Sequence, residues 1–264
     1  MAADVPPAVW ADSGRRLLLV AQQTLLEALR LRLAALFVVL GLALVLLAHW
    51  LREFNFGAAE LKFVADFGLG AIGLLGTLLA ALATAQLFFS DLECGFAACV
   101  LTKAVRRWEF LGGRLVGVMA LLALFVAGLG LVLGVLIAMR ETQLGGTFVP
   151  LPVLLQACAL VWLKVTLVAA MTLLVCSYAG SALFATWAGL LLAAIGHLRA
   201  FAGRTDWLGW LRFWPDLGLF DVDPLLGSGR ELSGGELLAL GGYWLVFTIL
   251  LTALAAYVFK HREI

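Results

Sequence analysis

Residues 151–198 read LPVLLQACALVWLKVTLVAAMTLLVCSYAGSALFATWAGLLLAAIGHL, and their only Lys, Arg, Asp or Glu is Lys164. As a single helix at ~1.5 Å per residue, this stretch would be about twice as long as the ~30 Å hydrocarbon core of a bilayer. It must therefore fold back on itself. The turn-like residues 178–181 (Tyr-Ala-Gly-Ser) lie near its middle. The stretch predicts two membrane-spanning helices, over 153–177 and 181–198.

The rest of the chain has the same character. Of 264 residues, 64% are hydrophobic and 13% are charged, about half the charged fraction of a soluble domain. Long apolar runs cover 33–51, 67–89, 115–139 and 237–259. The sequence predicts an all-α integral membrane protein with six transmembrane helices. Its net charge of +1 gives no reason to expect a nucleic acid partner.

Six crossings place both termini on the same side of the membrane, and the distribution of Lys and Arg indicates which side. The bias favours cytoplasmic termini and a multi-pass protein of the cell membrane, inner or plasma. The basic residues on the expected cytoplasmic side are Arg15, Arg16, Arg30, Arg32, Lys103, Arg106, Arg107, Arg114, Lys260 and Arg262; those on the other side are Arg52, Lys62, Arg140, Arg199, Arg204, Arg212 and Arg230.

Three segments lie outside the spans. Within the cytoplasmic N-terminus, 1–32, apolar residues recur at helical spacing over 14–32, which predicts an amphipathic helix in the cytoplasmic interface. The segment 199–236 is a long outer loop, whose clustered Trp and Phe residues we expect to anchor it on the membrane surface. Residues 260–264 form a cytoplasmic C-terminus.

No motif for catalysis, metal binding or nucleotide binding is found. We therefore expect no catalytic residues, no metal and no cofactor in this chain, with its four cysteines as structural thiols. Residues 232–236, LSGGE, differ by one residue from the LSGGQ signature of ATP-binding-cassette (ABC) ATPases. Here Ser233 and Glu236 have the spacing of a capping box and predict the start of the last helix.

The segment 90–114 joins the second and third spans. It contains Glu93-x-Gly95 and then Leu101-x-Lys103-x-Val105-x-Arg107-x-Glu109-Phe110-Leu111-x-Gly113. Its charges suit a short helix that docks on a soluble partner, although an ordinary positively charged cytoplasmic loop would have similar features. Two further motifs are Gln23-Thr24-Leu25-Leu26-Glu27-Ala28-Leu29-Arg30 and Phe259-Lys260-His261-Arg262-Glu263.

At these three places the chain resembles the export-type (ABC-2-like) permease subunits of ABC transporters, especially the group with the permease of nitrous oxide reductase maturation. One departure is Ala104, where the family usually has proline. The resemblance implies a permease that pairs with an ABC ATPase, which holds ATP and Mg²⁺, and with a second copy or a homologous permease. It implies a cytoplasmic coupling helix within 90–114, with ATPase contacts at Glu93, Lys103, Arg106, Arg107 and Glu109, and with support from Glu27 and Arg30 in the interfacial helix.

An alternative is a secondary transporter or channel driven by an ion gradient, which normally shows inverted repeats and several intramembrane charges. An intramembrane enzyme acting on lipid has no catalytic residues to support it here. For Lys164, two interpretations stay open. Its helix could begin later, so that the ammonium reaches the outer headgroups with help from Trp162; or Lys164 could line the translocation path and favour an anionic substrate.

Overall fold

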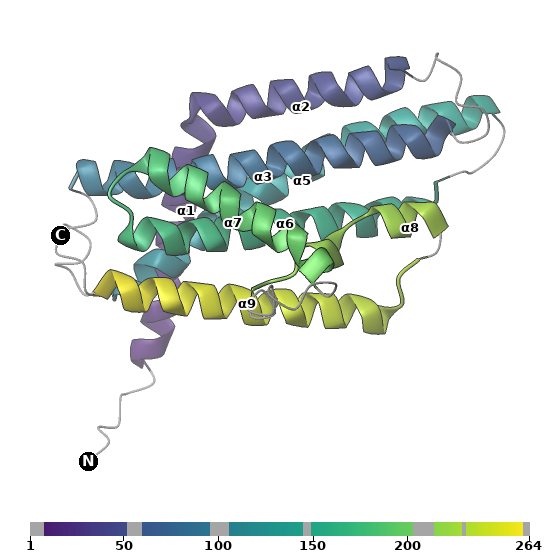
Figure 1. Ribbon diagram of the computed structural model, residues 1–264. Coiled ribbons are helices and arrows are strands. Elements are labelled where there is room, and N and C mark those ends of the chain that lie inside the picture. Colours follow the sequence, from purple (N-terminus) through teal and green to yellow (C-terminus); the bar gives the residue numbers. More distant parts are fainter. Residues whose placement is uncertain are drawn as a thin grey trace.

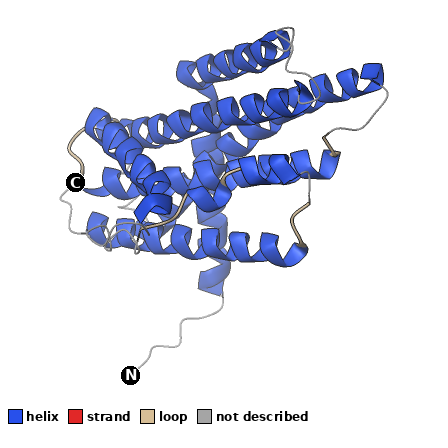
Figure 2. Cartoon of the chain, turned by 45° about the vertical axis from the view of Figure 1, so that its right-hand side comes forward, coloured by secondary structure: helices blue, strands red, loops and turns tan. Residues whose placement is uncertain are grey.

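The protein is described by a computed structural model that covers residues 8–51, 60–95, 106–144, 149–202, 214–228 and 231–260. Within these ranges all regular secondary structure is helical, as Figure 2 shows. The elements are α1 (Ala8–Arg30), α2 (Arg32–Leu51), α3 (Glu60–Glu93), α5 (Arg107–Leu144), α6 (Leu151–Tyr178), α7 (Ala182–Ala202), the short 3₁₀ helix η4 (Gly218–Phe220), α8 (Asp223–Ser228) and α9 (Gly234–Lys260).

The long helices fit a multi-pass membrane protein, which confirms the fold class in its coarse form. Five helices, α3, α5, α6, α7 and α9, are long and apolar enough to cross a bilayer, and the number rises to six when the bent pair α1–α2 is counted as one span. Each predicted span lies within one of the observed helices or begins at most one residue outside it. Helices α3 and α5 extend well beyond the apolar runs, and at ~1.5 Å per residue both exceed the ~30 Å hydrocarbon core.

The helices form a bundle with α6 near its middle. Helix α6 packs against α3, α5, α7 and α9, and most of its side chains are buried. Helices α2 and α9 lie along opposite edges of the bundle (Figure 1). The turn between α6 and α7 falls on residues 179–181, where the sequence predicts it. The Ser181 hydroxyl accepts a hydrogen bond from the Phe184 N–H at 3.3 Å and so caps α7.

Helix α1 crosses the bundle at a large angle to the other helices (Figure 1). The chain bends by 65° between α1 and α2. Helix α1 packs mainly against α5, through a face that buries Ala21, Thr24 and Ala28. Residues 14–30 of the predicted amphipathic segment are therefore helical and dock on the bundle through small side chains, and their position in the membrane interface stays a prediction. We call this end of the molecule, where α9 also finishes, the α1 end.

At the opposite end, residues 214–228 turn back into the bundle. Leu217 and Phe220 are fully buried, and the Leu217 N–H donates a hydrogen bond to the Gly196 carbonyl of α7 at 3.3 Å. The Trp214 indole donates to the Leu192 carbonyl at 3.1 Å. This part of the predicted outer loop 199–236 thus packs its apolar side chains between helices, and Trp207, Trp210 and Phe213, which we expect to anchor the loop, lie outside the described residues.

Helix α9 begins with the predicted capping box. The Ser233 N–H donates to the Glu236 carboxylate at 2.7 Å, and the Glu236 N–H donates to the Ser233 hydroxyl at 3.3 Å. Each side chain therefore satisfies one backbone donor that the first helical turn leaves free. The near-signature at 232–236 thus has a structural role as a helix start.

Candidate functional site

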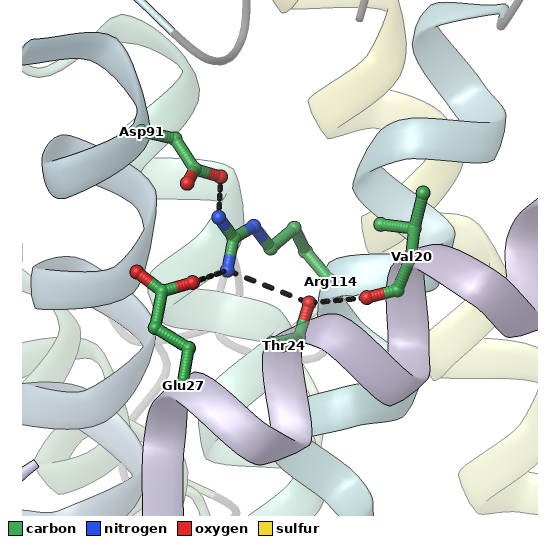
Figure 3. A network of polar contacts seen from close by, with 5 residues as sticks. All are labelled: Val20, Thr24, Glu27, Asp91 and Arg114. Atoms are coloured by element: carbon green, nitrogen blue, oxygen red, sulfur yellow. Dashed lines mark hydrogen bonds and ion pairs between the residues drawn. The ribbon is translucent and has the colours of Figure 1, made fainter. Parts of the chain in front are cut away.

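A buried arginine joins three helices at the α1 end. Arg114, in the second turn of α5, donates to the Glu27 carboxylate of α1 at 3.0 Å and forms an ion pair with Asp91 near the end of α3. It also donates to the Thr24 hydroxyl at 3.4 Å, which in turn donates to the Val20 carbonyl at 2.7 Å. Figure 3 shows the guanidinium between the two carboxylates.

The burial of this network makes it structurally important. The side chains of Arg114 and Asp91 are 4% and 5% exposed, and that of Glu27 is 33% exposed. Buried charges remain stable only when they are paired and hydrogen-bonded. Here two carboxylates pair with one guanidinium, whose Nη1 is hydrogen-bonded to Glu27 and Thr24, whereas its Nε has no hydrogen-bond partner among the described residues. The network therefore ties α1 to both helices that flank the segment 90–114.

Two glycines of α5 allow α1 to approach closely. A Cβ atom at Gly113 would lie 2.7 Å from Cβ of Val20, and one at Gly117 would lie 2.5 Å from Cβ of Thr24. The added atoms would also lie 2.9 and 2.8 Å from backbone carbonyls of α1. Small residues spaced by four let helix backbones pack closely in membranes. The close contact in turn places Thr24 and Glu27 within reach of Arg114.

A polar groove of about 530 Å³ lies beside this network, between α1 and the end of α3. It contains two of the residues that the sequence singles out, Glu27 and Arg30, together with Asp91. Its further lining residues are Leu19, Gln22, Gln23, Leu26, Ser90 and Cys94. The groove offers amide, carboxylate and guanidinium groups on one surface, which suits a polar protein partner more than an acyl chain.

The residues expected to contact an ATPase fall into different surroundings. Glu93 and Arg106 are exposed, at the two edges of the gap between α3 and α5. Glu109 is fully buried, and its carboxylate accepts a hydrogen bond from the Arg106 N–H at 2.9 Å, so that it caps α5. Lys103 lies outside the described residues, as do the other residues of 96–105 in the predicted coupling segment 90–114.

Arg107 has partners within the chain. Its guanidinium donates to the carbonyls of Phe259 and Lys260 at 2.8 and 2.7 Å, and it lies 5.8 Å from the centre of the Phe259 ring. Carbonyls at a helix C-terminus lack partners within the helix and carry partial negative charge, so a cation stabilises them. Arg107 therefore caps α9 and joins the basic C-terminal motif to the start of α5.

For Lys164, the observed helix does not begin later than predicted, and a place on the translocation path stays a prediction. Helix α6 begins at Leu151 rather than later, and the Trp162 indole donates to the Met119 carbonyl of α5 at 3.1 Å. The Lys164 ammonium lies 2.6 Å from the Asp221 carboxylate, in the segment that turns back into the bundle. The Asp221 carboxylate therefore neutralises this ammonium, so that the pair carries no net positive charge.

This ion pair lines a cavity of about 390 Å³ between α3, α6, α7 and the segment 220–226. Besides Lys164 and Asp221, its polar residues are Asp66, Thr77, His197 and Asp223. Apolar side chains such as Leu69, Val161 and Phe220 form much of the remaining wall. Ligand sites commonly combine a cavity of this size, apolar walls and a few polar groups. We call it the charged cavity.

Only part of each charged centre, the Arg114 network and the charged cavity, could be recognised in the sequence. Arg114 was expected only as one of many cytoplasmic basic residues, and Asp91, Asp66, Asp221 and Asp223 were not singled out. One signal was available: Gly113 and Gly117 have the spacing at which membrane helices approach closely. No comparable signal identified Asp221 as the partner of Lys164, because 57 residues separate them.

Possible metal ligands, cysteines and similarity to known proteins add nothing further to the description of the site. Among the described residues, no group of three or more His, Cys, Asp and Glu side chains could hold a metal ion. Within the described ranges, Cys94, Cys158 and Cys176 are not in disulfide bonds. No protein-family model and no curated protein sequence matches this chain.

Proposed function

We propose that this chain is the transmembrane permease subunit of an ABC transporter of the export type. It would couple ATP hydrolysis on a separate ATPase subunit to movement of a substrate across the membrane. The chain itself would then carry no catalytic residue, and ATP and Mg²⁺ would bind to the ATPase. A second copy or a homologous permease would complete the membrane unit, with the surrounding lipid as its solvent.

One observation supports this proposal more than any other: the Arg114 network. A partner that pushes on the segment 90–114 would displace the ends of α3 and α5, which flank it. Asp91 and Arg114 lie at those ends and hold Glu27 of α1. A displacement of the segment would therefore reach three helices together. Rigid helices joined by buried ion pairs are a physical route for such coupling.

The proposed contact surface consists of exposed residues near this network. Glu93 and Arg106 flank the segment 90–114, and Arg30 lines the neighbouring polar groove. Arg107 and Glu109 would act differently, as caps that fix the start of α5. In this proposal, Glu93, Arg106 and Arg30 contact the ATPase directly, and Arg107 and Glu109 hold the docking surface in position.

A charge reversal tests the assignment of this surface. The full chain is purified from membranes that contain its ATPase, and the amount of bound ATPase and its rate of ATP hydrolysis are measured. Arg106→Glu should reduce both, because it places a carboxylate on the contact surface. Arg140→Glu is the matched control, since Arg140 lies near the end of α5 that is remote from α1. Equal ATPase binding and hydrolysis in both variants would contradict the docking surface.

The charged cavity favours a second candidate, a transporter driven by an ion gradient. Ionisable residues within membrane helices commonly mark ion pathways, and Lys164 and Asp66 lie on α6 and α3. In this alternative, the purified chain would be active without any ATPase. Uptake into vesicles that follows an imposed ion gradient and is independent of ATP would favour it over the permease.

A further inference from the structure

We infer that the charged cavity is a binding site for organic cations, meaning molecules with an ammonium or similar group on an apolar body. The observations that carry this inference are the charges around the cavity, its length along α3 and its apolar walls. Binding of the cation does not depend on the proposed function. Only the further step, that the bound cation is the transported substrate, rests on it.

The charge balance of the cavity is negative. Three carboxylates, those of Asp66, Asp221 and Asp223, line it together with one ammonium, that of Lys164. Lys164 pairs with Asp221 at 2.6 Å, and Lys62 of α3 lies close enough to attract Asp66 electrostatically, so the carboxylates outnumber the neighbouring cations by one. Asp66 and Asp223 are close enough to repel each other electrostatically. A cation placed between like charges relieves such repulsion, whereas an anion increases it.

The shape of the cavity suits a ligand with an apolar part. Along α3, the lining residues of the cavity run from Asp66 to Leu78. The helical rise from Asp66 to Thr77 is about 16 Å at ~1.5 Å per residue. Asp66 and Asp223 are exposed, while Lys164 is only 16% exposed. The two carboxylates therefore lie at the mouth, where Leu74 is also exposed, and the buried Leu69, Val161 and Phe220 lie deeper. An ammonium group would stay near the mouth while its apolar body enters.

The wall that the returning segment supplies is firmly attached. Besides the buried Leu217 and Phe220, Tyr243 of α9 accepts a hydrogen bond from the Asp216 N–H at 2.7 Å. Arg199 of α7 donates to the Trp214 carbonyl and, at 3.3 Å, to the Tyr243 hydroxyl. A cavity with fixed walls needs no rearrangement before a ligand binds, which lowers the cost of binding.

The test uses three probes of similar size that differ in charge: phenyltrimethylammonium, the neutral tert-butylbenzene and the anion benzenesulfonate. Binding to the purified full chain in detergent is measured by equilibrium dialysis, with binding to protein-free micelles subtracted. We expect the cation to bind most tightly. A benzenesulfonate affinity equal to or above that of the cation would overturn the inference, as would tert-butylbenzene binding as tightly as the cation, or no detectable binding of the cation.

Variants make the sign of the effect specific. Lys164→Met should tighten binding of the cation by about tenfold, because it removes a positive charge from the lining and leaves the Asp221 carboxylate without its cation. Asp66→Asn should weaken the same binding by a similar factor, and Arg140→Met, outside the cavity, should leave it unchanged. Weaker cation binding in folded Lys164→Met would overturn the inference. If Lys164→Met does not fold, Asp66→Asn and Asp223→Asn test the inference instead. An unchanged affinity for the cation in both variants would overturn the inference.

The same preparation separates this inference from the proposed function. A chain that binds phenyltrimethylammonium but associates with no ATPase would contradict the permease and leave the cation site intact. A chain that carries an active ATPase but does not bind the cation would contradict the cation site alone.

Discussion

Replacement of Arg114 by methionine should destabilise the protein strongly. Methionine keeps much of the side-chain volume and removes the charge. Asp91, 5% exposed, would then be left as a buried carboxylate without its cation. Removing one partner of a buried ion pair costs about 3 to 5 kcal/mol. Glu27 is 33% exposed, so water replaces part of its interaction. We expect a loss of about 3 kcal/mol, at the low end of that range.

The assay is unfolding of the purified chain by SDS in mixed micelles, followed by circular dichroism. Arg15→Met is the matched control, because Arg15 is exposed on the same helix as Glu27, and exposed substitutions usually change stability by less than about 0.5 kcal/mol. Adding Asp91→Asn to Arg114→Met should recover about 1 to 2 kcal/mol, since it removes the unpaired charge. A loss below about 1 kcal/mol for Arg114→Met would refute the argument.

Three further predictions concern packing, topology and capping. Gly117→Ala should destabilise by about 1 to 3 kcal/mol, because the new methyl group meets Thr24 of α1, whereas Gly128→Ala, with open space around it, should be neutral or stabilising; SDS unfolding compares the two. Cysteines placed at the exposed Arg15 and Lys260, in a cysteine-free background, should resist an impermeant thiol reagent in intact cells, whereas one at the exposed Glu231 should react; the reverse pattern would invert the orientation. Ser233→Ala should cost about 0.5 to 2 kcal/mol through loss of the cap of α9, and an unchanged free energy of unfolding would contradict that role.

Much of the helical framework could be predicted from local patterns. The apolar stretch 151–198 was long enough to require a turn, and the turn lies at 179–181. The spacing of Ser233 and Glu236 identified the start of α9, because a capping box involves only residues three apart. These features depend on neighbouring residues along the chain, so the sequence alone contains the information.

The charged centres could not be predicted in the same way. Arg114 meets Glu27 across 87 positions and Lys164 meets Asp221 across 57. Which charges meet depends on how the helices pack, and that packing depends on contacts such as Gly117 against Thr24. The returning segment shows the same limit. Its tryptophan and phenylalanine residues are equally typical of a membrane surface and of a buried turn between helices.

The measurement that most directly tests the central proposal is ATP hydrolysis by the complex purified through this chain. The full-length chain is isolated with an affinity tag from the membranes of its own cell, reconstituted in lipid, and assayed with ATP and Mg²⁺. The account predicts a co-purified P-loop ATPase in stoichiometric amount, with hydrolysis that falls when Arg106→Glu replaces the native chain. The account would be contradicted by a chain that is isolated without an ATPase and that, after reconstitution, transports a solute when an ion gradient is imposed.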